Sequence, residues 1–516
     1  MGRLYLLYIL AFLLHPLKAE SVVWISERKD VLSALFLWLV IYLYLDYLDR
    51  RRVWLYILTN LAFLFALASK ASVVGLPLFL LVLDWYRNQT FSLKSLTNKI
   101  PFFVMALFFG IVNIVAQSRI HVSLIPPDKK YVNLLYQIQF YIEKTIFPWG
   151  LRALYSPQFL NFSLIGIFSI ILISSLIIYI FKKYSDQKKN LLLGWSLFIL
   201  FLLPYLKLIP FGDESIVHDR YMYISLTGLT IAFFPFVLQS IQQLWAKQKR
   251  PFSLAVMGVL ITLMFQWLYL MHLQIPYWKD PITLWQYTAS LEPNSKKVNQ
   301  ELAKVFLING QNEEAIPYLQ KSRGAAEDFA NMGYALLKIK KSTEAEDIIL
   351  EGLKKYPNDS SLLNILGVIE LDKRNSQWAL ALFTEALQKL RDEINPKLRS
   401  LILNHIGLAN LQLENFTVAE SFFRRSISLI NNDENTIYNL GSVLLIQNHK
   451  EEAKNLFLQA IKLNPRRAET YNNIGFIFYQ DKNLKEARSW FNRALEIDPS
   501  FKMAKNNLIA MDKDRH

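Results

Sequence analysis

The chain has 516 residues, of which 53% are hydrophobic, 14% aromatic and 19% charged, and it contains no cysteine. This composition excludes an ordinary soluble protein, and the lack of cysteine excludes a disulfide framework or a cysteine-ligated metal site. The net charge of +15 is uneven, because residues 1–275 hold 25 basic and 12 acidic residues whereas residues 276–516 hold 32 and 30. A basic stripe on the soluble half is therefore absent, which excludes nucleic acid as a partner.

The polarity of the sequence divides it into two predicted domains, a transmembrane domain at 1–275 and a soluble domain at 276–516. The first half alternates apolar runs such as "FSIILISSLIIYIF" with short charged patches, and each run approaches the length that crosses a hydrocarbon core. We predict an all-α protein with about nine transmembrane helices, at 3–17, 31–48, 53–69, 71–86, 100–117, 161–181, 191–210, 221–244 and 252–273.

The charged loops predict the orientation of this domain. Residues 132–148 carry Glu143 and Lys144, so we expect a helix at the interface or a re-entrant helix there. Nine spans then place the lysine-rich loops at 182–189 and 246–250, together with Lys99, on the cytoplasmic side. The first apolar run ends in "HPLK" without a small-residue cleavage site, so we interpret it as a span. We expect an integral membrane protein with a cytoplasmic N-terminus and the soluble half on the opposite, outer face.

Four outer loops gather the ionisable residues of interest: "HPLKAESVVWISERKD", "SKAS", the segment 118–160 and "FGDESIVHDR". Ionisable groups near a membrane core are costly and are candidates for function. The candidates are His15, Glu20, Arg28, Asp30, Lys70, Tyr155, Asp213, Glu214, His218, Asp219, Arg220 and Tyr221. No set with metal-ligand spacing stands out among them.

Each candidate also has a structural explanation. Asp30 can cap the helix that follows it, within a self-neutralising "ERKD" start. Lys70 can extend to the interface from a helix end, and "HDRY" at 218–221 can be a charged entry to a span. Asp213 and Glu214 can be solvated loop residues, and His15 beside a proline can end a helix.

The soluble half contains a repeat of 34 residues, visible when 434–467 is aligned with 468–501. Gly475 aligns with Gly441 and Ala487 with Ala453, and the same glycine-to-alanine spacing recurs upstream. We predict six tetratricopeptide repeats, which begin near residues 296, 326, 360, 400, 434 and 468, with "DPITLWQYTASLEPNS" as a leading second helix and a six-residue insertion around "DEINP". Glycine and alanine mark the close crossing of the two helices in each repeat.

Such an array buries a continuous core and presents a concave surface. Residues Tyr438, Asn439, Tyr471, Asn472 and Asn473 are either solvated helix faces or parts of a groove for a protein or peptide. For the array as a whole we favour the groove.

Five motifs occur in the order of a known family: "HPLKAESVVWISERKDVLSALF", "SKASVVGLPLFLLVLDWY", "GWSLFILFLLPYLKLIP", "HDRYMYISLTGL" and the trailing repeats. The chain resembles the transmembrane and tetratricopeptide-repeat O-mannosyltransferase-like proteins in their bacterial form, over nearly its whole length. The resemblance implies a protein of a bacterial inner membrane and a glycosyltransferase of the C type, which passes a sugar from a polyprenyl-phosphate carrier to a protein hydroxyl on the outer, periplasmic face. It implies a base or orienting carboxylate, cations for the phosphate and a groove for the lipid.

Within this resemblance, Arg28, Lys70, His218 and Arg220 are the candidates for the donor phosphate, and the spans around 31–48 and 191–244 for the lipid groove. In the family, the catalytic acids sit in the first outer loop. This chain starts with what resembles the family's third span, so we expect that loop to be missing. Glu20, Asp30 and Asp219 remain as candidate carboxylates. The alternative is a non-catalytic membrane-anchored repeat scaffold. A transporter is disfavoured, because no paired broken spans are visible.

Overall fold

The computed structural model describes residues 13–88, 93–118, 130–156, 163–206, 217–246, 250–390 and 395–513. Within these ranges every regular element is a helix and none is a strand, which confirms the predicted all-α class. The chain forms two compact units, Met1–Leu302 and Ala303–His516. The expected boundary after residue 275 precedes this division and stays a prediction.

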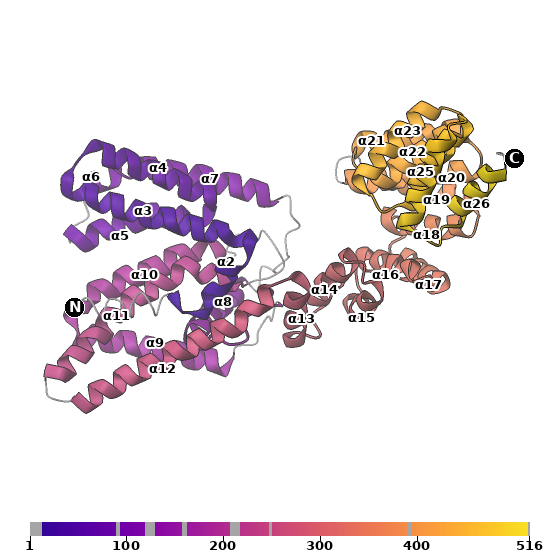
Figure 1. The fold of residues 1–516 in the computed structure, drawn as a ribbon. Coiled ribbons are helices and arrows are strands. Elements are labelled where there is room, and N and C mark those ends of the chain that lie inside the picture. The colour runs from indigo at the N-terminus through magenta and orange to yellow at the C-terminus, as the bar shows by residue number, and fades with distance from the viewer. Residues whose placement is uncertain are drawn as a thin grey trace. The chain divides into compact units, whose positions relative to one another are not determined.

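The first unit is a bundle of helices joined by short 3-10 segments (Figure 1). Its elements are η1 Pro16–Lys18, α2 Ala19–Val23, η2 Ile25–Glu27, α3 Arg28–Arg50, α4 Val53–Ser69, η3 Ala71–Gly75, α5 Leu76–Asn88, α6 Leu93–Thr97, α7 Ile100–Ser118, α8 Lys130–Ile146, α9 Leu164–Lys183, η5 Ser185–Gln187, α10 Lys188–Leu202, η6 Leu203–Tyr205, η7 Asp219–Tyr221, α11 Met222–Ala246, α12 Arg250–Gln274, η8 Ile275–Trp278 and α13 Pro281–Leu291.

Four helical segments of the described residues are long and apolar enough to cross a membrane: Arg28–Arg50, Leu164–Lys183, Asp219–Ala246 and Pro251–Trp278. The shorter apolar helices are Val53–Ser69 and Ile100–Ala116. The predicted number of nine is thus not clearly reproduced. The predicted spans 53–69 and 100–117 correspond to the two shorter apolar helices, and 3-10 segments leave α5 with 13 residues and α10 with 15. The predicted span 3–17 falls mostly outside the described residues, and the membrane sides stay predictions.

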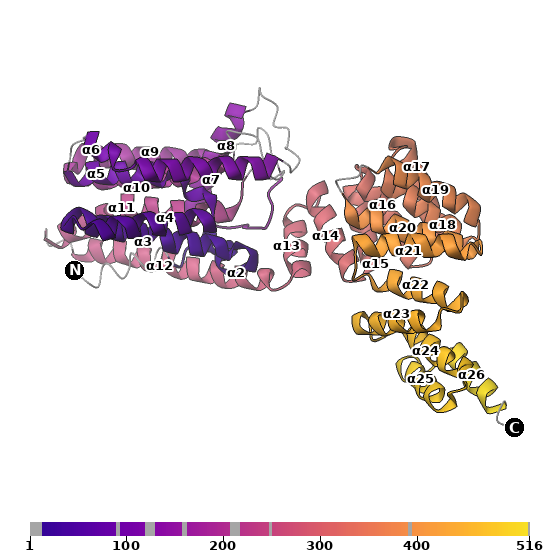
Figure 2. The same cartoon turned by 90° about the horizontal axis from the view of Figure 1, so that it is seen from above.

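Small residues allow the closest helix contact in this bundle. Gly194 of α10 faces Gly228 of α11, and a Cβ on Gly194 would lie 2.3 Å from the Gly228 carbonyl oxygen. The two helices consequently lie side by side (Figure 1, Figure 2). Such contacts hold apolar helices together where the hydrophobic effect between them is weak.

Lys99 lies in the turn between α6 and α7, within its predicted loop, but its side chain is not solvated. Its side chain is buried and binds Asp84, the Tyr44 hydroxyl and, at 3.2 Å, the Ser95 hydroxyl. Tyr44 also donates to Asp84 at 2.7 Å. A buried ammonium needs such partners, because desolvation is otherwise costly. Lys99 therefore joins α3 and α5 to the start of α7, and its membrane side stays a prediction.

The second half consists of consecutive helix pairs, as predicted. These are α14 Lys296–Ile308 with α15 Asn312–Ser322, α16 Ala326–Lys338 with α17 Ser342–Lys355, α18 Ser360–Asp372 with α19 Ser376–Lys389, α20 Pro396–Gln412 with α21 Phe416–Leu429, α22 Glu434–Ile446 with α23 Lys450–Leu463, and α24 Ala468–Gln480 with α25 Leu484–Ile497. The predicted leading helix is α13, and a final helix, α26 Lys502–Lys513, was not predicted. Most of the predicted insertion lies outside the described residues.

The predicted close crossing of the paired helices is confirmed. In four repeats, the glycine of the first helix faces a phenylalanine of the second, and an added Cβ would lie 2.5–2.8 Å from the ring. The pairs are Gly367 with Phe383, Gly407 with Phe423, Gly441 with Phe457 and Gly475 with Phe491. All four rings are fully buried, so the ring cannot move away without opening the core.

The turn between paired helices recurs with one left-handed residue. It is the seventh residue after the repeat glycine or its alanine equivalent: Gly310, Lys340, Arg374, Glu414, Asn448 and Lys482, with φ between 60° and 74°. Residues with a Cβ are disfavoured in this conformation. The turn geometry thus recurs although the residue type changes.

Successive first helices contact one another along the array, from α16 to α18, α20, α22, α24 and α26. No successive pair of second helices in the described residues is in comparable contact. The first helices therefore lie on the more tightly curved side of the stack, which is the concave side of a solenoid.

We predict that Gly407→Ala destabilises the repeats, because the new methyl group would lie 2.5 Å from a ring carbon of Phe423. The expected loss is about 1–3 kcal/mol of unfolding free energy, typical of overpacking. Denaturant unfolding of the purified full chain measures it, with the exposed Ser421→Ala as the control. Equal stability of both variants would contradict the crossing geometry.

We predict that Glu414→Gly stabilises the repeats by about 0.5–1 kcal/mol, because glycine adopts a positive φ without steric cost. Glu414 has a φ of 62°. The converse change, Gly310→Ala at a φ of 74°, is expected to destabilise. Thermal unfolding of the two variants checks both signs, and a lower melting temperature for Glu414→Gly would refute the explanation.

Candidate functional site

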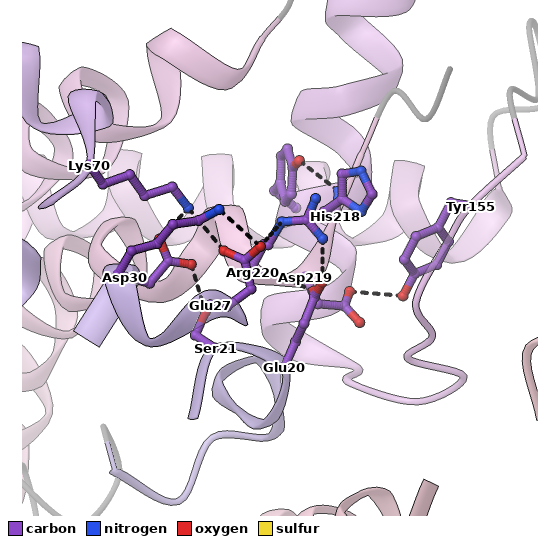
Figure 3. Close-up of polar contacts among 11 residues, drawn as sticks. Glu20, Ser21, Glu27, Asp30, Lys70, Tyr155, His218, Asp219 and Arg220 are labelled. Atoms are coloured by element: carbon purple, nitrogen blue, oxygen red, sulfur yellow. Dashed lines mark hydrogen bonds and ion pairs between the residues drawn. The ribbon is translucent and has the colours of Figure 1, made fainter. Parts of the chain in front are cut away.

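The predicted outer loops converge in the first unit. Short elements place their side chains: α2 carries Glu20, η2 carries Glu27, and α3 carries Asp30 in its first turn. Lys70 ends α4, and η7 carries Arg220 at the start of the α11 segment. These five residues come from segments up to 200 positions apart in the chain, and Figure 3 shows them pointing toward one another.

The five side chains alternate in charge, and we call them the ionic chain: Glu20, Arg220, Glu27, Lys70 and Asp30. The Arg220 guanidinium binds Glu20 at 2.5 Å, and its Nε lies 3.7 Å from Glu27. The Lys70 ammonium lies 3.5 Å from Glu27 and binds Asp30 directly. All five side chains are largely buried. Three carboxylates therefore surround two cations in a region of weak solvent screening.

Further hydrogen bonds fix both ends of the ionic chain. The backbone N–H of Arg220 donates to Glu20 at 2.8 Å, and the Ser21 hydroxyl donates to Asp30 at 3.2 Å. Burial opposes the charge on Lys70, but Tyr205, Asp30 and Glu27 hold its pKa above the usual value. Lys70 is thus a buried cation rather than a side chain that extends to the interface.

Asp30 does not cap its helix. The helix begins at Arg28, the N-cap Glu27 makes no side-chain capping bond, and the Asp30 carboxylate faces Lys70 and Ser21. Arg28 is exposed and makes no ion pair with the described residues, so it lies apart from the ionic chain. Asp213 and Glu214 lie outside the described residues.

Asp219 and Tyr155 form a second buried contact next to the ionic chain, because the Tyr155 hydroxyl donates to Asp219 at 2.8 Å. Burial and the Asp219 carboxylate raise the pKa of Tyr155 well above its usual value, so this phenol stays protonated. Arg152 stacks 4.6 Å over the Tyr155 ring and pairs with Glu292 at 2.7 Å. This contact ties the loop after α8 to the end of α13.

The remaining candidates have structural contacts. The His15 ring accepts from the Leu17 N–H at 3.3 Å and donates to the Thr145 carbonyl at 3.0 Å, so it caps η1. The His218 backbone N–H donates to the Tyr141 hydroxyl at 3.4 Å. Tyr221 stacks on Tyr205 with ring centres 4.0 Å apart.

Sequence reasoning did not single out Glu27, Ser21, Arg152 or Lys18. Glu27 lies in the "ISERKD" motif, but only the fold shows that it bridges two cations. Lys18 is buried with its ammonium 5.0 Å from the Tyr223 ring centre, and burial lowers its pKa to about 6. Among the described residues, no group of three histidine or acidic side chains has the arrangement of a metal site.

The second candidate site is the accessible side of the first helices in the array, which we call the inner face. It comprises Ile365 and Val368 of α18, Leu401, His405 and Leu408 of α20, Asn435, Asn439 and Ser442 of α22, and Asn473 and Phe476 of α24. On each helix these residues recur at spacings of three and four, on the side away from the second helix. The predicted Asn439 and Asn473 belong to this face, whereas Asn472 is buried.

A tetratricopeptide-repeat family profile matches residues 438–500. Among solved structures, the chain is similar to YrrB, a TPR protein with an unusual peptide-binding site, with 18% identity over 38% of this chain and 96% of that one and a TM-score of 0.29. It is also similar to PilF of Pseudomonas aeruginosa, with 17% identity over 42% and 97% of the chains and a TM-score of 0.36. For PilW, a type IV pilus biogenesis factor, the identity is 14% over 41% and 98% and the TM-score is 0.36.

No curated protein matches the chain. The profile match and the recurring helix pairs together show that the chain contains tetratricopeptide repeats.

Proposed function

We propose that the chain is a membrane-anchored scaffold whose inner face binds a protein or peptide partner. The observation that carries this proposal is the continuous accessible face along α18, α20, α22 and α24. Solenoids of this kind bind partners on their concave side. The long apolar helices of the first unit supply the anchor.

The side chains of the inner face support binding rather than simple solvation. Leu401 is 44% exposed on the inner face, and Ile365, Val368, Leu408 and Phe476 are partly exposed around it. Apolar side chains that share one face of a repeat array gain free energy when a partner covers them. A scaffold role requires no chemistry from the ionic chain, which then stabilises the outer segments of the bundle.

We predict that a photoreactive phenylalanine analogue at Leu401 forms a covalent adduct with a partner protein in intact membranes. The matched control is Leu429 on α21, the second helix of the same repeat, which is 42% exposed compared with 44% for Leu401. Adducts from Leu401 alone support binding at the inner face. Equal adducts from both positions, or none from Leu401, would argue against it.

A second candidate function is sugar transfer from a polyprenyl-phosphate carrier to a protein acceptor on the outer face. The observation that favours it is the convergence of Glu20, Asp30, Lys70 and Arg220 from separate loops into one buried cluster. Lys70 and Arg220 are the cations for the phosphate in this proposal, with Glu20, Asp30 or Asp219 as the acceptor-side carboxylate. A phosphate would have to displace carboxylates that already bind both cations.

An apolar cavity of about 220 Å³ offers a place for the lipid in this second proposal. It lies between α11 and α12, where Leu229, Phe233, Met264 and Trp267 are among the lining residues. Its position differs from the groove expected between 31–48 and 191–244, because α12 forms one wall.

If the chain transfers sugar, we predict that Lys70→Met and Arg220→Met each reduce transfer at least about 100-fold, as removal of a charge-stabilising donor does. The exposed Lys182→Met at the end of α9 is the control. A membrane transfer assay with a lipid-linked sugar measures it, and the melting temperature of each variant separates unfolding from lost chemistry. No transfer by the native chain, or full transfer by folded variants, would reject this function.

A further inference from the structure

The end of the helix bundle that lies opposite the ionic chain is basic, and we call it the basic end. The ionic chain joins the first turn of α3, the end of α4 and the start of the α11 segment, so the other ends of these helices lie at the basic end (Figure 1). The ring centre of Tyr205, which follows α10, lies 5.4 Å from the Lys70 ammonium, so α10 starts at the basic end too. The exposed or half-buried cations there are Arg50, Arg51, Arg52, Arg87, Lys182, Lys183, Lys188 and Lys189.

Two of these cations, Arg51 and Arg52 in the turn between α3 and α4, make no ion pair with the described residues, and both are exposed. Arg51 has a left-handed backbone conformation with a φ of 54°, and α4 runs back along α3 (Figure 1, Figure 2). Both guanidinium groups are therefore accessible to an anion at the end of this helix pair. Several of the neighbouring cations already have partners: Arg50 pairs with Asp46 at 2.7 Å, Arg87 pairs with Asp49, and Lys183 donates to the Tyr179 hydroxyl at 2.7 Å.

An apolar stripe runs from this turn along the outer side of α4. Its residues recur at spacings of three and four, so they share one face of the helix, and the first and last of them are 50% and 47% exposed. The stripe covers about 16 Å of helix at 1.5 Å per residue. One leaflet of a bilayer supplies about half of a hydrocarbon core of roughly 30 Å, which is nearly the same length. The stripe consists of Trp54, Ile57, Leu58, Leu61, Leu64 and Phe65.

Exposed aromatic side chains indicate the depth of the basic end in a bilayer. Trp54 is the second residue of α4, and Trp245 lies one residue before the end of α11. Tyr179 lies in the last turns of α9, and Trp245 and Tyr179 are 46% and 44% exposed. Tryptophan and tyrosine are enriched where a membrane meets water. Three helices thus place such a residue at the basic end, which puts Arg51 and Arg52 at the level of the lipid headgroups.

Resting on the membrane anchor of the proposed scaffold, we infer that Arg51 and Arg52 bind the headgroup of an anionic phospholipid whose acyl chain lies along the apolar stripe. Guanidinium groups match phosphate geometry and keep their charge. A zwitterionic headgroup carries its own ammonium and gains less from two arginines than a headgroup with net negative charge. Free phosphate would leave the stripe uncovered, and a soluble acidic protein would not reach a stripe that faces the hydrocarbon core.

The test uses the full chain in phosphatidylcholine bilayers that contain phosphatidylglycerol, with bromine on the acyl chains of one of the two lipids. Bromine quenches tryptophan fluorescence on contact, and the difference between the native chain and Trp54→Phe isolates the signal of Trp54. Exchanging the brominated lipid gives the relative binding constant at this position. We expect a preference for phosphatidylglycerol of at least about fivefold, since one arginine near an anionic surface contributes about that factor. High salt is expected to reduce the preference.

Two matched double variants locate the site. Arg51→Gln with Arg52→Gln is expected to lower the relative binding constant to about one, and glutamine leaves the backbone strain at residue 51 unchanged because it also has a Cβ. Lys182→Gln with Lys183→Gln removes the same charge from the basic end and is expected to keep the preference. Equal melting temperatures establish that both variants remain folded.

Three results would overturn the inference: equal affinity of the native chain for both lipids, equal loss of preference in the two double variants, or displacement of the lipid by millimolar inorganic phosphate. Each of them leaves the membrane anchor intact, provided that both brominated lipids quench Trp54. Absence of quenching by either lipid would reject the anchor together with the inference. Adducts from Leu401 test partner binding by the repeats independently of these outcomes.

Discussion

The close crossing of the two helices in each repeat is the constraint on which the second half depends. A glycine at one position lets a fully buried phenylalanine of the paired helix approach its backbone, as at Gly407 and Phe423. This contact fixes the second helix on one side of the first. The first helices then contact one another through their remaining sides and leave one side accessible. The inner face is therefore a consequence of the core packing, and its chemistry can vary without loss of the fold.

A different constraint governs the first unit, where charged groups are buried among apolar helices. Buried ions persist when opposite charges and hydrogen bonds replace their hydration. The ionic chain meets this condition by alternation, since each cation lies between two carboxylates. The arrangement joins α2, α3, the end of α4 and η7, which are separate in the sequence. This joining is a sufficient structural reason for the charged loops, with or without sugar transfer.

The boundaries of the repeats could be predicted because each repeat satisfies the same steric rule at the same spacing. The left-handed conformation of the turn residues could not be predicted. Lys340, Arg374 and Glu414 occupy that position, and none of them is the glycine that usually indicates a positive φ. Helix α26 was not predicted because it lacks a paired second helix. The glycine-to-alanine spacing that marks the other repeats is therefore absent there.

Apolar runs likewise do not show where a 3-10 segment interrupts a helix, as at Ala71–Gly75 and Leu203–Tyr205, so the predicted spans 71–86 and 191–210 became shorter helices. Eight of the twelve predicted outer-face residues contact one another or a shared neighbour in the first unit: Glu20, Asp30, Lys70, Tyr155, His218, Asp219, Arg220 and Tyr221. The sequence alone could not show which of these side chains form ion pairs or hydrogen bonds with each other. Asp30 shows the difficulty, because its position fits a helix cap while its carboxylate binds Lys70. The hydrogen bonds between successive first helices were also hidden, since partners such as Asn439 and Asn404 lie 35 or 41 residues apart in the sequence.

The central claim, that the inner face is the binding surface, can be tested directly because the chain contains no cysteine. Ser442→Cys places one thiol on the inner face, and Ser421→Cys places one on α21; both hydroxyls bond only to their own helix backbone. The rate of thiol labelling in native membranes is measured with the partner present and after its removal. The account predicts that the partner slows labelling at residue 442 and leaves residue 421 unchanged. Equal protection of both thiols, or of neither, would contradict it.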